Sequence, residues 1–295
     1  MKYEINEKQL TVYGVEDFDL EASCECGQSF RWRKLDGKIH GIVGDKSVTV
    51  ALDSGKLTVT PCGQDDAAFW IKYFDLERNY NEIQELIRND SMLSVCLPYA
   101  LGIHVFNQDP FEALMSFIVS SNNNIKRIVG IIDRLCMLAG EPLACHESCY
   151  AFPAAKSIAE LPLESLYGIG LGYRAPYIKH SAEIIANGYD LEALRTMPLY
   201  EARKELCTFP GVGPKVADCV LLFSLGHTNA FPVDVWIERA MTELYFSDSS
   251  TSGTSAARPA PSKSEIQAAA RSIGKLSGIV QQYIFFYARN QKLGT

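Results

Sequence analysis

Short segments of alternating apolar and polar residues dominate the first hundred positions. Alternation with a period of two is typical of half-buried β-strands. The turn-forming residues Gly44-Asp45 and Asp53-Ser54-Gly55 separate neighbouring segments and favour hairpins. We therefore predict an antiparallel sheet, followed by helical segments near 65–74 and 76–88. The alternating segments are 10–12, 39–43, 48–52 and 57–59.

From about residue 111 the apolar residues recur at intervals of three and four instead of two, as in Ile125, Ile128 and Ile132. This spacing is typical of amphipathic helices. We predict an α+β fold in which residues 1–110 form an N-terminal antiparallel-sheet domain with flanking helices. Residues 111–295 are then a helical domain packed on it. Within that domain 247–263 is rich in Ser, Thr, Ala and Pro and predicts a mobile loop, after which a helix resumes at 264–272.

The composition is close to that of an ordinary globular protein, with 47% hydrophobic and 21% charged residues. The formal net charge of −7 argues weakly against binding nucleic acid through bulk electrostatics. The longest apolar runs, such as 220–223, are too short to span a bilayer. The amino terminus is charged and lacks the apolar stretch of a secretory signal. We expect an intracellular protein, in the cytoplasm or nucleoid of a bacterium or in the nucleus of a eukaryote.

The nine cysteines are odd in number and irregularly spaced, which argues against a disulfide scaffold. Cys145 and Cys149 flank His146, but no second ligand pair follows at the spacing of a zinc site. No cysteine follows Cys219, so we expect no carboxy-terminal iron–sulfur cluster.

The segment 205–241 carries the most informative chemistry. Gly211-Val212-Gly213 predicts a tight turn between two helices, with both glycines free to take positive φ, and Pro214 suits the first position of the second helix. Backbone N–H groups in such a turn can hold a phosphate without a basic side chain. The alternative is a plain connection between helices that binds nothing.

Lys215 lies immediately inside that second helix, whose following turns are apolar nearly all round. The helix dipole and partial burial both disfavour an ammonium group, which favours an amine nucleophile. About twenty residues later, Asp234 suits the N-cap of another helix. A carboxylate facing the lysine would also stabilise positive charge on a sugar carbon whose glycosidic bond is breaking. Alternatively, Lys215 extends to solvent or to a DNA phosphate, and Asp234 only caps its helix.

These elements together resemble the helix-hairpin-helix base-excision glycosylases, and within them the 8-oxoguanine DNA glycosylase family. The motifs that carry the resemblance occur in the family's order and span essentially the whole chain. They are CGQSFRW (26–32), SSNNN (120–124), GLGYR (170–174), PGVG (210–213), KVADC (215–219) and PVD (232–234).

The resemblance implies a bifunctional enzyme of base excision repair that excises 8-oxoguanine opposite cytosine and cleaves the strand as an abasic-site lyase. Lys215 would attack the sugar C1′ and form a Schiff base, and Asp234 would be the catalytic carboxylate. The partner would be damaged double-stranded DNA, with no membrane involved, and the enzyme would be a monomer that needs no cofactor.

A damaged base must leave the helical stack to be reached, so a base pocket is implied as well. Gly27 resembles the residue whose carbonyl accepts a hydrogen bond from the N7–H that distinguishes the oxidised guanine. Cys219 and Phe285 resemble the pair that sandwiches the base. Gln281 resembles the side chain that reads its Watson–Crick edge.

Further positions resemble those that hold the DNA itself. Asn122, Arg127 and Arg174 would bind the orphaned cytosine, and Tyr173 would wedge into the opened duplex. The hairpin glycines Gly211 and Gly213 would contact the phosphate backbone. The carbonyls of the hairpin would bind a potassium or sodium ion, as in relatives, and these are the carbonyls of Cys207, Phe209 and Val212.

The sequence departs from the family pattern at two positions. Trp236 stands where better-known eukaryotic relatives carry a histidine near a DNA phosphate, and an indole N–H can still donate to phosphate. Phe223 stands where a methionine is common in the base pocket. Two alternatives stay open: a glycosylase of the same superfamily for another damaged base, and a non-catalytic DNA binder in which Lys215 only contacts phosphate.

Overall fold

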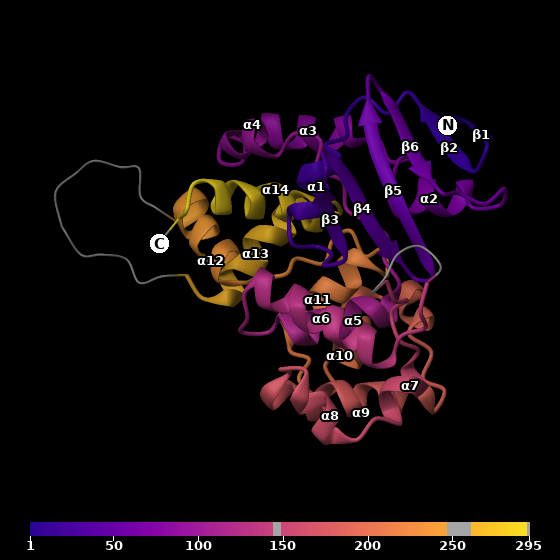
Figure 1. Ribbon diagram of the computed structural model, residues 1–295. Coiled ribbons are helices and arrows are strands. Elements are labelled where there is room, and N and C mark those ends of the chain that lie inside the picture. The colour runs from indigo at the N-terminus through magenta and orange to yellow at the C-terminus, as the bar shows by residue number, and fades with distance from the viewer. Residues whose placement is uncertain (144–148, 247–260, 294–295) are drawn as a thin grey trace.

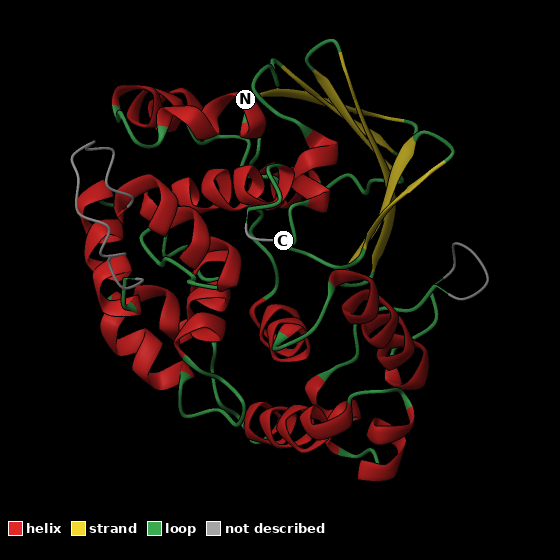
Figure 2. Ribbon diagram, turned by 90° about the vertical axis from the view of Figure 1, so that its left-hand side faces the viewer, coloured by secondary structure: helices red, strands yellow, loops and turns green. Residues whose placement is uncertain are grey.

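The computed structural model describes residues 1–143, 149–246 and 261–293. A twisted antiparallel sheet forms one end of the molecule, and helices form the remainder (Figures 1 and 2). The chain therefore has the predicted α+β architecture. The residues of the cysteine and histidine cluster at 145–146 and most of the predicted loop, 247–260, lie outside the described residues.

The sheet has six strands in the order β1-β2-β6-β5-β4-β3, and every neighbouring pair is antiparallel. Alternation predicted four of these strands, because each buries every second side chain. The strands are β1 (Lys2–Asn6), β2 (Gln9–Tyr13), β3 (Trp32–Leu35), β4 (Lys38–Val43), β5 (Lys46–Asp53) and β6 (Lys56–Thr60).

One face of the sheet is covered by α2, whose aromatic side chains pack against it. Trp70 and Phe74 are fully buried there, together with the alternate apolar residues of β2, β5 and β6. The Trp32 ring lies directly over Gly41 of the paired strand, where no other residue would fit. The first helices are α1 (Leu20–Glu25), α2 (Ala67–Tyr73), α3 (Tyr80–Asn89), η1 (Ser94–Cys96) and α4 (Leu97–Ala100).

The helical body has a second hydrophobic core, centred on α5, α11 and α14. Segments of the N-terminal part also contribute to it, namely Cys26, Phe30 and α3. The body begins with α5 (Pro110–Ser120), α6 (Ile125–Ala139), α7 (Ala155–Ala159), α8 (Leu163–Gly168), η2 (Gly172–Arg174), α9 (Ala175–Ala186) and η3 (Glu192–Thr196). It continues with α10 (Leu199–Leu206), α11 (Pro214–Phe223), α12 (Val235–Met241), η4 (Thr242–Phe246), α13 (Lys263–Ile273) and α14 (Ser277–Asn290).

Helix α13 begins inside the range predicted as a loop. Ser262 is its N-cap, with a capping box in which Ser262 and Glu265 bond each other's backbone N–H groups. This arrangement makes Lys263 the first helical residue, so the prediction of a loop to 263 was wrong at its last position. Within the ranges given above, every helix is too short or too polar to cross a lipid bilayer.

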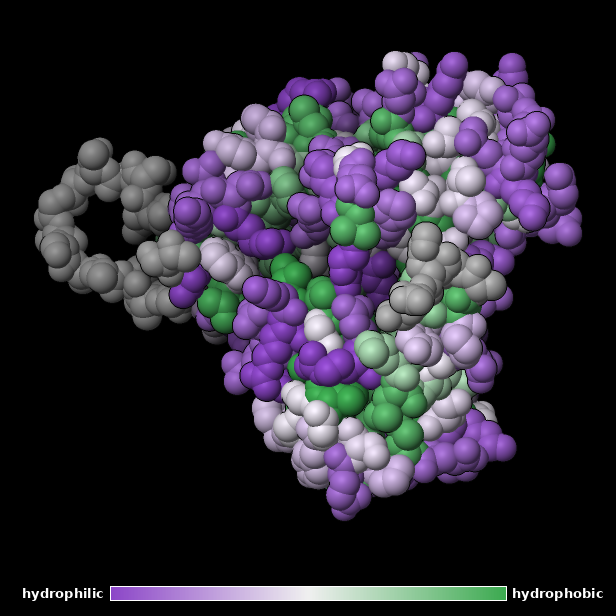
Figure 3. All heavy atoms as spheres, in the orientation of Figure 1, coloured by the Kyte–Doolittle hydropathy of each residue, from purple (hydrophilic) through white to green (hydrophobic). Residues whose placement is uncertain are grey.

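The two cores do not divide the chain at residue 110, because α3 and α4 belong to the helical core. The surface reflects the same layout. On the face of Figure 3, hydrophilic residues cover most of the sheet, and the larger hydrophobic patches lie over the helical body. The domain boundary at 110 stays a prediction.

Candidate active site

The helical hairpin forms as predicted between α10 and α11, with one difference at its glycines. Gly211 has φ +77°, and a Cβ atom there would lie 2.4 Å from the Tyr177 ring. Only glycine fits this position. Gly213 instead has extended backbone as the N-cap of α11, and a Cβ there would meet open space. Both glycines are exposed, as a contact with a DNA phosphate requires.

Lys215 follows Pro214 in the first turn of α11 and is half-buried. Its Nζ donates a hydrogen bond to Ser120 Oγ at 3.5 Å and lies 5.5 Å from the centre of the Phe117 ring. No carboxylate forms an ion pair with this amine within the described residues. The amine is therefore held beside an aromatic wall by weak hydrogen bonding and not by an ion pair.

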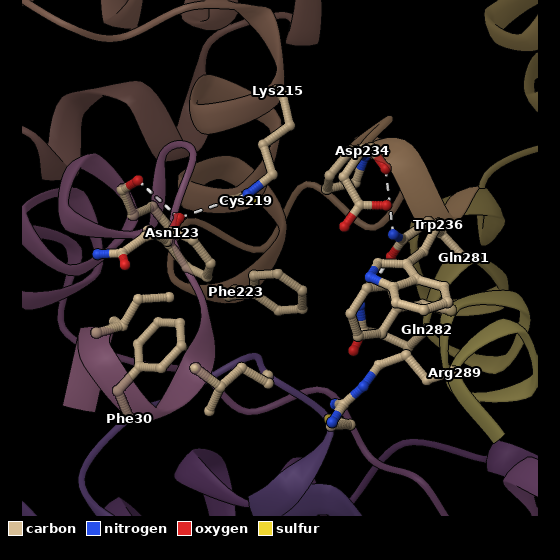
Figure 4. Close-up of a pocket in the computed structure, with 18 of the residues that line it drawn as sticks. Phe30, Asn123, Lys215, Cys219, Phe223, Asp234, Trp236, Gln281, Gln282 and Arg289 are labelled. Carbon is tan, nitrogen blue, oxygen red and sulfur yellow. Dashed lines mark hydrogen bonds between the residues drawn. The ribbon is translucent and has the colours of Figure 1, made fainter. Parts of the chain in front are cut away.

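Asp234 is the N-cap of α12, as predicted, and its Oδ1 accepts a hydrogen bond from the Ile237 N–H at 2.9 Å. Burial raises the pKa of this carboxyl above its ordinary value, although the Ile237 N–H and the charge of Lys215 partly oppose the shift. Asp234 and Lys215 face one cavity from neighbouring elements (Figure 4). The structure thus brings the two predicted catalytic residues together.

This cavity has a volume of about 410 Å³ and opens to solvent. Three parts of the chain line it: the loop after α1, the α5–α6 region, and the helices α11, α12 and α14. All four residues predicted to bind the base line it, together with Phe223, as predicted for the base pocket. They are Gly27, Cys219, Gln281 and Phe285.

The base-binding residues are arranged as two apolar walls and one polar wall. Gly27 has φ +80°, and a Cβ there would lie 3.6 Å from the Phe285 ring, so the loop packs closely on that aromatic. Burial raises the pKa of the Cys219 thiol to about 12, so the group stays a neutral, apolar surface. Gln281 is 3% exposed, and its Nε2 donates to the Pro232 carbonyl at 3.1 Å.

Eleven of the residues that line the cavity were not predicted from the sequence, and five of them add aromatic rings, amides or a charge. Phe117 stacks on Phe223 with ring centres 5.4 Å apart, and Phe30 packs edge-on against Phe117. Two polar side chains, Asn123 and Gln282, also line the cavity. The last is Arg289, whose guanidinium donates to the Glu25 carbonyl at 3.2 Å and lies 5.6 Å from the centre of the Phe285 ring.

Four of the predicted DNA-contacting residues lie outside the cavity, in the 120–124 loop, at the start of α6 and in η2. Asn122 and Arg127 are exposed, and Tyr173 is 53% exposed with its hydroxyl donating to the Ser121 carbonyl at 3.3 Å. Arg174 differs, because only 3% of it is exposed. Its guanidinium bonds the carbonyls of Leu171, Ser121 and Asn122.

Trp236 lines the cavity, whereas the resemblance implied a position near a DNA phosphate. The Arg239 guanidinium lies 5.7 Å from its ring centre, which is a cation–π distance. The indole is half-buried on the same wall as Gln282 and Arg289 (Figure 4). A contact between Trp236 and phosphate stays a prediction.

The three carbonyls predicted to bind a cation belong to the segment between α10 and α11. Cys207 is the C-cap of α10, where carbonyls have no partner within the helix. The Phe209 carbonyl accepts a hydrogen bond from the Val212 N–H at 3.1 Å and keeps its second lone pair. Carbonyl oxygens of this kind suit a potassium or sodium ion, so the donor set fits the predicted ion.

Comparison with known proteins covers both parts of the chain. Residues 11–114 match the model of the 8-oxoguanine DNA glycosylase N-terminal domain, and residues 115–260 match that of the HhH-GPD superfamily of base excision DNA repair proteins. A probable N-glycosylase/DNA lyase of Methanothermobacter thermautotrophicus is 32% identical over 95% of this chain and 96% of its own length. An N-glycosylase/DNA lyase of Saccharomyces cerevisiae is 31% identical over 83% of this chain and 70% of its own.

Solved structures agree with these matches. The Clostridium acetobutylicum 8-oxoguanine glycosylase/lyase, in complex with double-stranded DNA containing cytosine opposite 8-oxoguanine, superposes with a TM-score of 0.91 at 35% identity. The superposition covers 99% of both chains. The two matching models and the full-length relatives show that this chain belongs to the 8-oxoguanine DNA glycosylase family, within the helix-hairpin-helix base excision repair superfamily.

Proposed function

We propose that this protein excises 8-oxoguanine opposite cytosine from duplex DNA and then cleaves the strand at the abasic site. The observation that carries the proposal is the placement of Lys215 and Asp234 on one base-sized cavity. An amine beside a carboxylate is the constellation needed to displace a base and retain the sugar as an imine. The N-glycosylase/DNA lyase names of the full-length relatives support the same reaction.

Base excision begins when the damaged nucleotide leaves the duplex and enters the cavity. The aromatic walls provide stacking surface, and Gln281 provides polar groups for the Watson–Crick edge. The Gly27 carbonyl then accepts the N7–H that 8-oxoguanine has and guanine lacks. This one proton distinguishes the lesion from the normal base.

The Lys215 amine attacks C1′ as the bond between C1′ and the base breaks, and the base leaves with the electron pair and takes up a proton. Asp234 stabilises the positive charge that develops on the sugar, because its carboxylate faces the same cavity. Ring opening gives the imine of Lys215. Loss of a C2′ proton then expels the 3′ phosphate, and hydrolysis of the imine regenerates the amine.

The remaining roles belong to the DNA-facing residues around the cavity. We propose that Asn122, Arg127 and Arg174 bind the orphaned cytosine and that Tyr173 fills the space left by the flipped base. The exposed hairpin N–H groups would hold phosphate, with a potassium or sodium ion on the hairpin carbonyls and no other cofactor. The enzyme would act as a monomer inside the cell.

Borohydride trapping tests the proposal directly, because the reductant converts an imine into a stable covalent bond. The substrate is a duplex with one 8-oxoguanine opposite cytosine, with undamaged and abasic duplexes alongside. The variants are Lys215→Gln and, as a matched control, Lys275→Gln, which removes an exposed lysine that does not line the cavity. We expect an adduct with the wild type and Lys275→Gln and none with Lys215→Gln.

The possible outcomes distinguish the specificity for 8-oxoguanine from the lyase chemistry. Trapping on abasic DNA alone would retain the lyase and contradict the 8-oxoguanine assignment. Failure to trap either duplex would favour a DNA-binding protein without catalysis. An adduct that persists in Lys215→Gln would assign the nucleophile to another amine.

A further inference from the structure

Two adjacent glutamines on α14 form a hydrogen-bonded chain along one wall of the cavity (Figure 4). Gln281 Nε2 donates to the Pro232 carbonyl at 3.1 Å, and Gln282 Nε2 donates to Gln281 Oε1 at 2.7 Å. Each glutamine is 3% exposed. The chain stops at Gln282 Oε1, which is buried and has no hydrogen-bond partner within the described residues.

The Pro232 carbonyl fixes the direction of both hydrogen bonds in this series. The Pro232 carbonyl can only accept, so Gln281 must turn its NH₂ group towards it. Gln281 Oε1 then faces Gln282, which must in turn present its own NH₂ group. Rotating the Gln282 amide by half a turn would place two acceptor oxygens against each other. The unpartnered atom at the end of the chain is therefore an acceptor.

A buried acceptor without a partner is costly, and native structures rarely retain one without a function. Gln282 lines the cavity that the flipped base would enter. A ligand with an N–H group at this point would supply the missing hydrogen bond. The unmet acceptor thus indicates what kind of edge the cavity is built to receive.

The two amides keep some hydrogen-bonding capacity after they have bonded each other and Pro232. Gln281 Nε2 and Gln282 Nε2 each keep one N–H, Gln281 Oε1 keeps one lone pair, and Gln282 Oε1 keeps both of its lone pairs. The two amides therefore have two oxygens that can still accept a hydrogen bond. The Watson–Crick edge of a guanine has two donor groups, N1–H and the 2-amino group, beside the acceptor O6. An adenine edge has one donor, the 6-amino group, beside the N1 acceptor, so it can supply only one of the two oxygens.

We propose that Gln282 is a second base-reading residue, whose Oε1 accepts a hydrogen bond from the 2-amino group of the flipped 8-oxoguanine. This inference rests on the proposed function, since it presumes that 8-oxoguanine enters the cavity. It adds a determinant that the family resemblance did not supply. Gln281 reads O6 and N1–H, and Gln282 reads the third group of the edge.

The test pairs one substitution with one change in the substrate. Gln282→Met keeps the length of the side chain but removes the acceptor. 8-Oxohypoxanthine keeps N7–H, O6 and N1–H of 8-oxoguanine but lacks the 2-amino group. Single-turnover excision of each base opposite cytosine is measured with both proteins, and strand cleavage at a preformed abasic site is measured as a reaction that needs no base contact.

We expect the wild type to excise 8-oxoguanine about tenfold faster than 8-oxohypoxanthine, the size of effect that one base-edge hydrogen bond supports. Gln282→Met should excise both bases at similar rates, about tenfold below the wild-type rate on 8-oxoguanine. Its lyase activity should match that of the wild type. Gln267→Met is the matched control, because Gln267 lies on α13, donates to the Phe231 carbonyl and does not line the cavity.

Each other outcome contradicts a specific step. A wild type that excises the two bases equally overturns the role of the 2-amino group without any variant. An equal loss on both substrates in Gln282→Met assigns Gln282 only to the support of Gln281. A wild type that cleaves abasic DNA but excises neither base contradicts the proposed function, which is a different failure from a wild type that does not discriminate.

Discussion

Gly278 fixes the position of α14 relative to the segment that leads into Asp234. It is the second residue of the helix, and its N–H donates to the Thr228 carbonyl at 2.8 Å. A Cβ atom at this position would lie 2.2 Å from the Ala230 carbonyl oxygen and 2.8 Å from that of Thr228. Both contacts are with backbone, so a side-chain rotation cannot relieve them. Gly278→Ala must therefore separate α14 from the 228–230 segment.

The expected cost follows from three contributions. Overpacking a closely packed contact costs about 1–3 kcal/mol, and disrupting the Gly278 hydrogen bond costs about 1 kcal/mol. Replacing a helical glycine with alanine gains up to about 1 kcal/mol. The net loss of unfolding free energy is about 1–3 kcal/mol, which corresponds to a Tm lower by about 2–5 °C in a chain of this size.

The effect on function is expected to exceed the effect on stability. Reaching a tolerable contact of about 3 Å from 2.2 Å needs a displacement of about 0.8 Å. This displacement would move Gln281 and Phe285, one and two turns further along the same helix. A misplacement of about 1 Å can lower a rate by about a hundredfold. We expect base excision to fall by ten- to a hundredfold, with a smaller loss of strand cleavage at a preformed abasic site.

Thermal unfolding and single-turnover kinetics are measured for Gly278→Ala beside a matched glycine substitution. Gly168 is the last residue of α8, and a Cβ there would meet nothing within 4 Å. Gly168→Ala should leave the Tm unchanged or raise it slightly and leave both activities intact. If Gly278→Ala behaves like Gly168→Ala, the close approach of α14 does not position the base pocket.

Three further predictions follow from contacts described above. The excision rate should fall with decreasing pH as Asp234 takes up a proton. Because burial raises the pKa of Asp234, the fall should begin at a higher pH than for an ordinary carboxyl. A flat profile from about pH 4 to 8 would contradict this. Gly41→Ala places a Cβ 2.1 Å from the Trp32 ring and should lower the unfolding free energy, measured with urea, by about 1–3 kcal/mol. An unchanged urea midpoint would show that the ring has room to move. Tyr173→Ala should change stability by less than about 0.5 kcal/mol, because the ring is 53% exposed, yet lower kcat/KM on the lesion duplex; unaltered kinetics would exclude a wedge at this position.

Alternation could predict those strands that bury every second side chain, and it could not predict the two others. Strand β1 is exposed at nearly every position, since it forms an edge of the sheet and pairs with β2 on one side only. Strand β3 is the opposite edge and buries only Trp32. Their pairing with a neighbour holds them in the sheet, and pairing leaves no apolar period in the sequence. Helix boundaries were accurate where a side chain caps the helix, as at Asp234.

The site was predictable where a residue belongs to a motif and hidden where its role depends on packing between distant segments. Phe30 and Phe117 look like ordinary core aromatics in the sequence, and they become pocket walls only because the loop after α1 packs against α5. Gln282 gave no signal, because most of α14 around it is buried and periodicity cannot separate a pocket face from a core face. Its unmet acceptor becomes visible only once the Pro232 carbonyl has set the direction of the neighbouring amides.

The role of Arg174 also depends on packing between distant segments, although the residue belongs to a motif. An arginine in a DNA-binding motif suggests an exposed cation, yet this guanidinium is buried and bonds the carbonyls of Ser121 and Asn122. Asn122 has φ +48°, a strained conformation for a residue with a side chain, and these bonds help to hold it there. Arg174 therefore positions the 120–124 loop before any DNA is bound. Whatever part it takes in binding the orphaned cytosine, it takes with only those N–H groups that the loop leaves free.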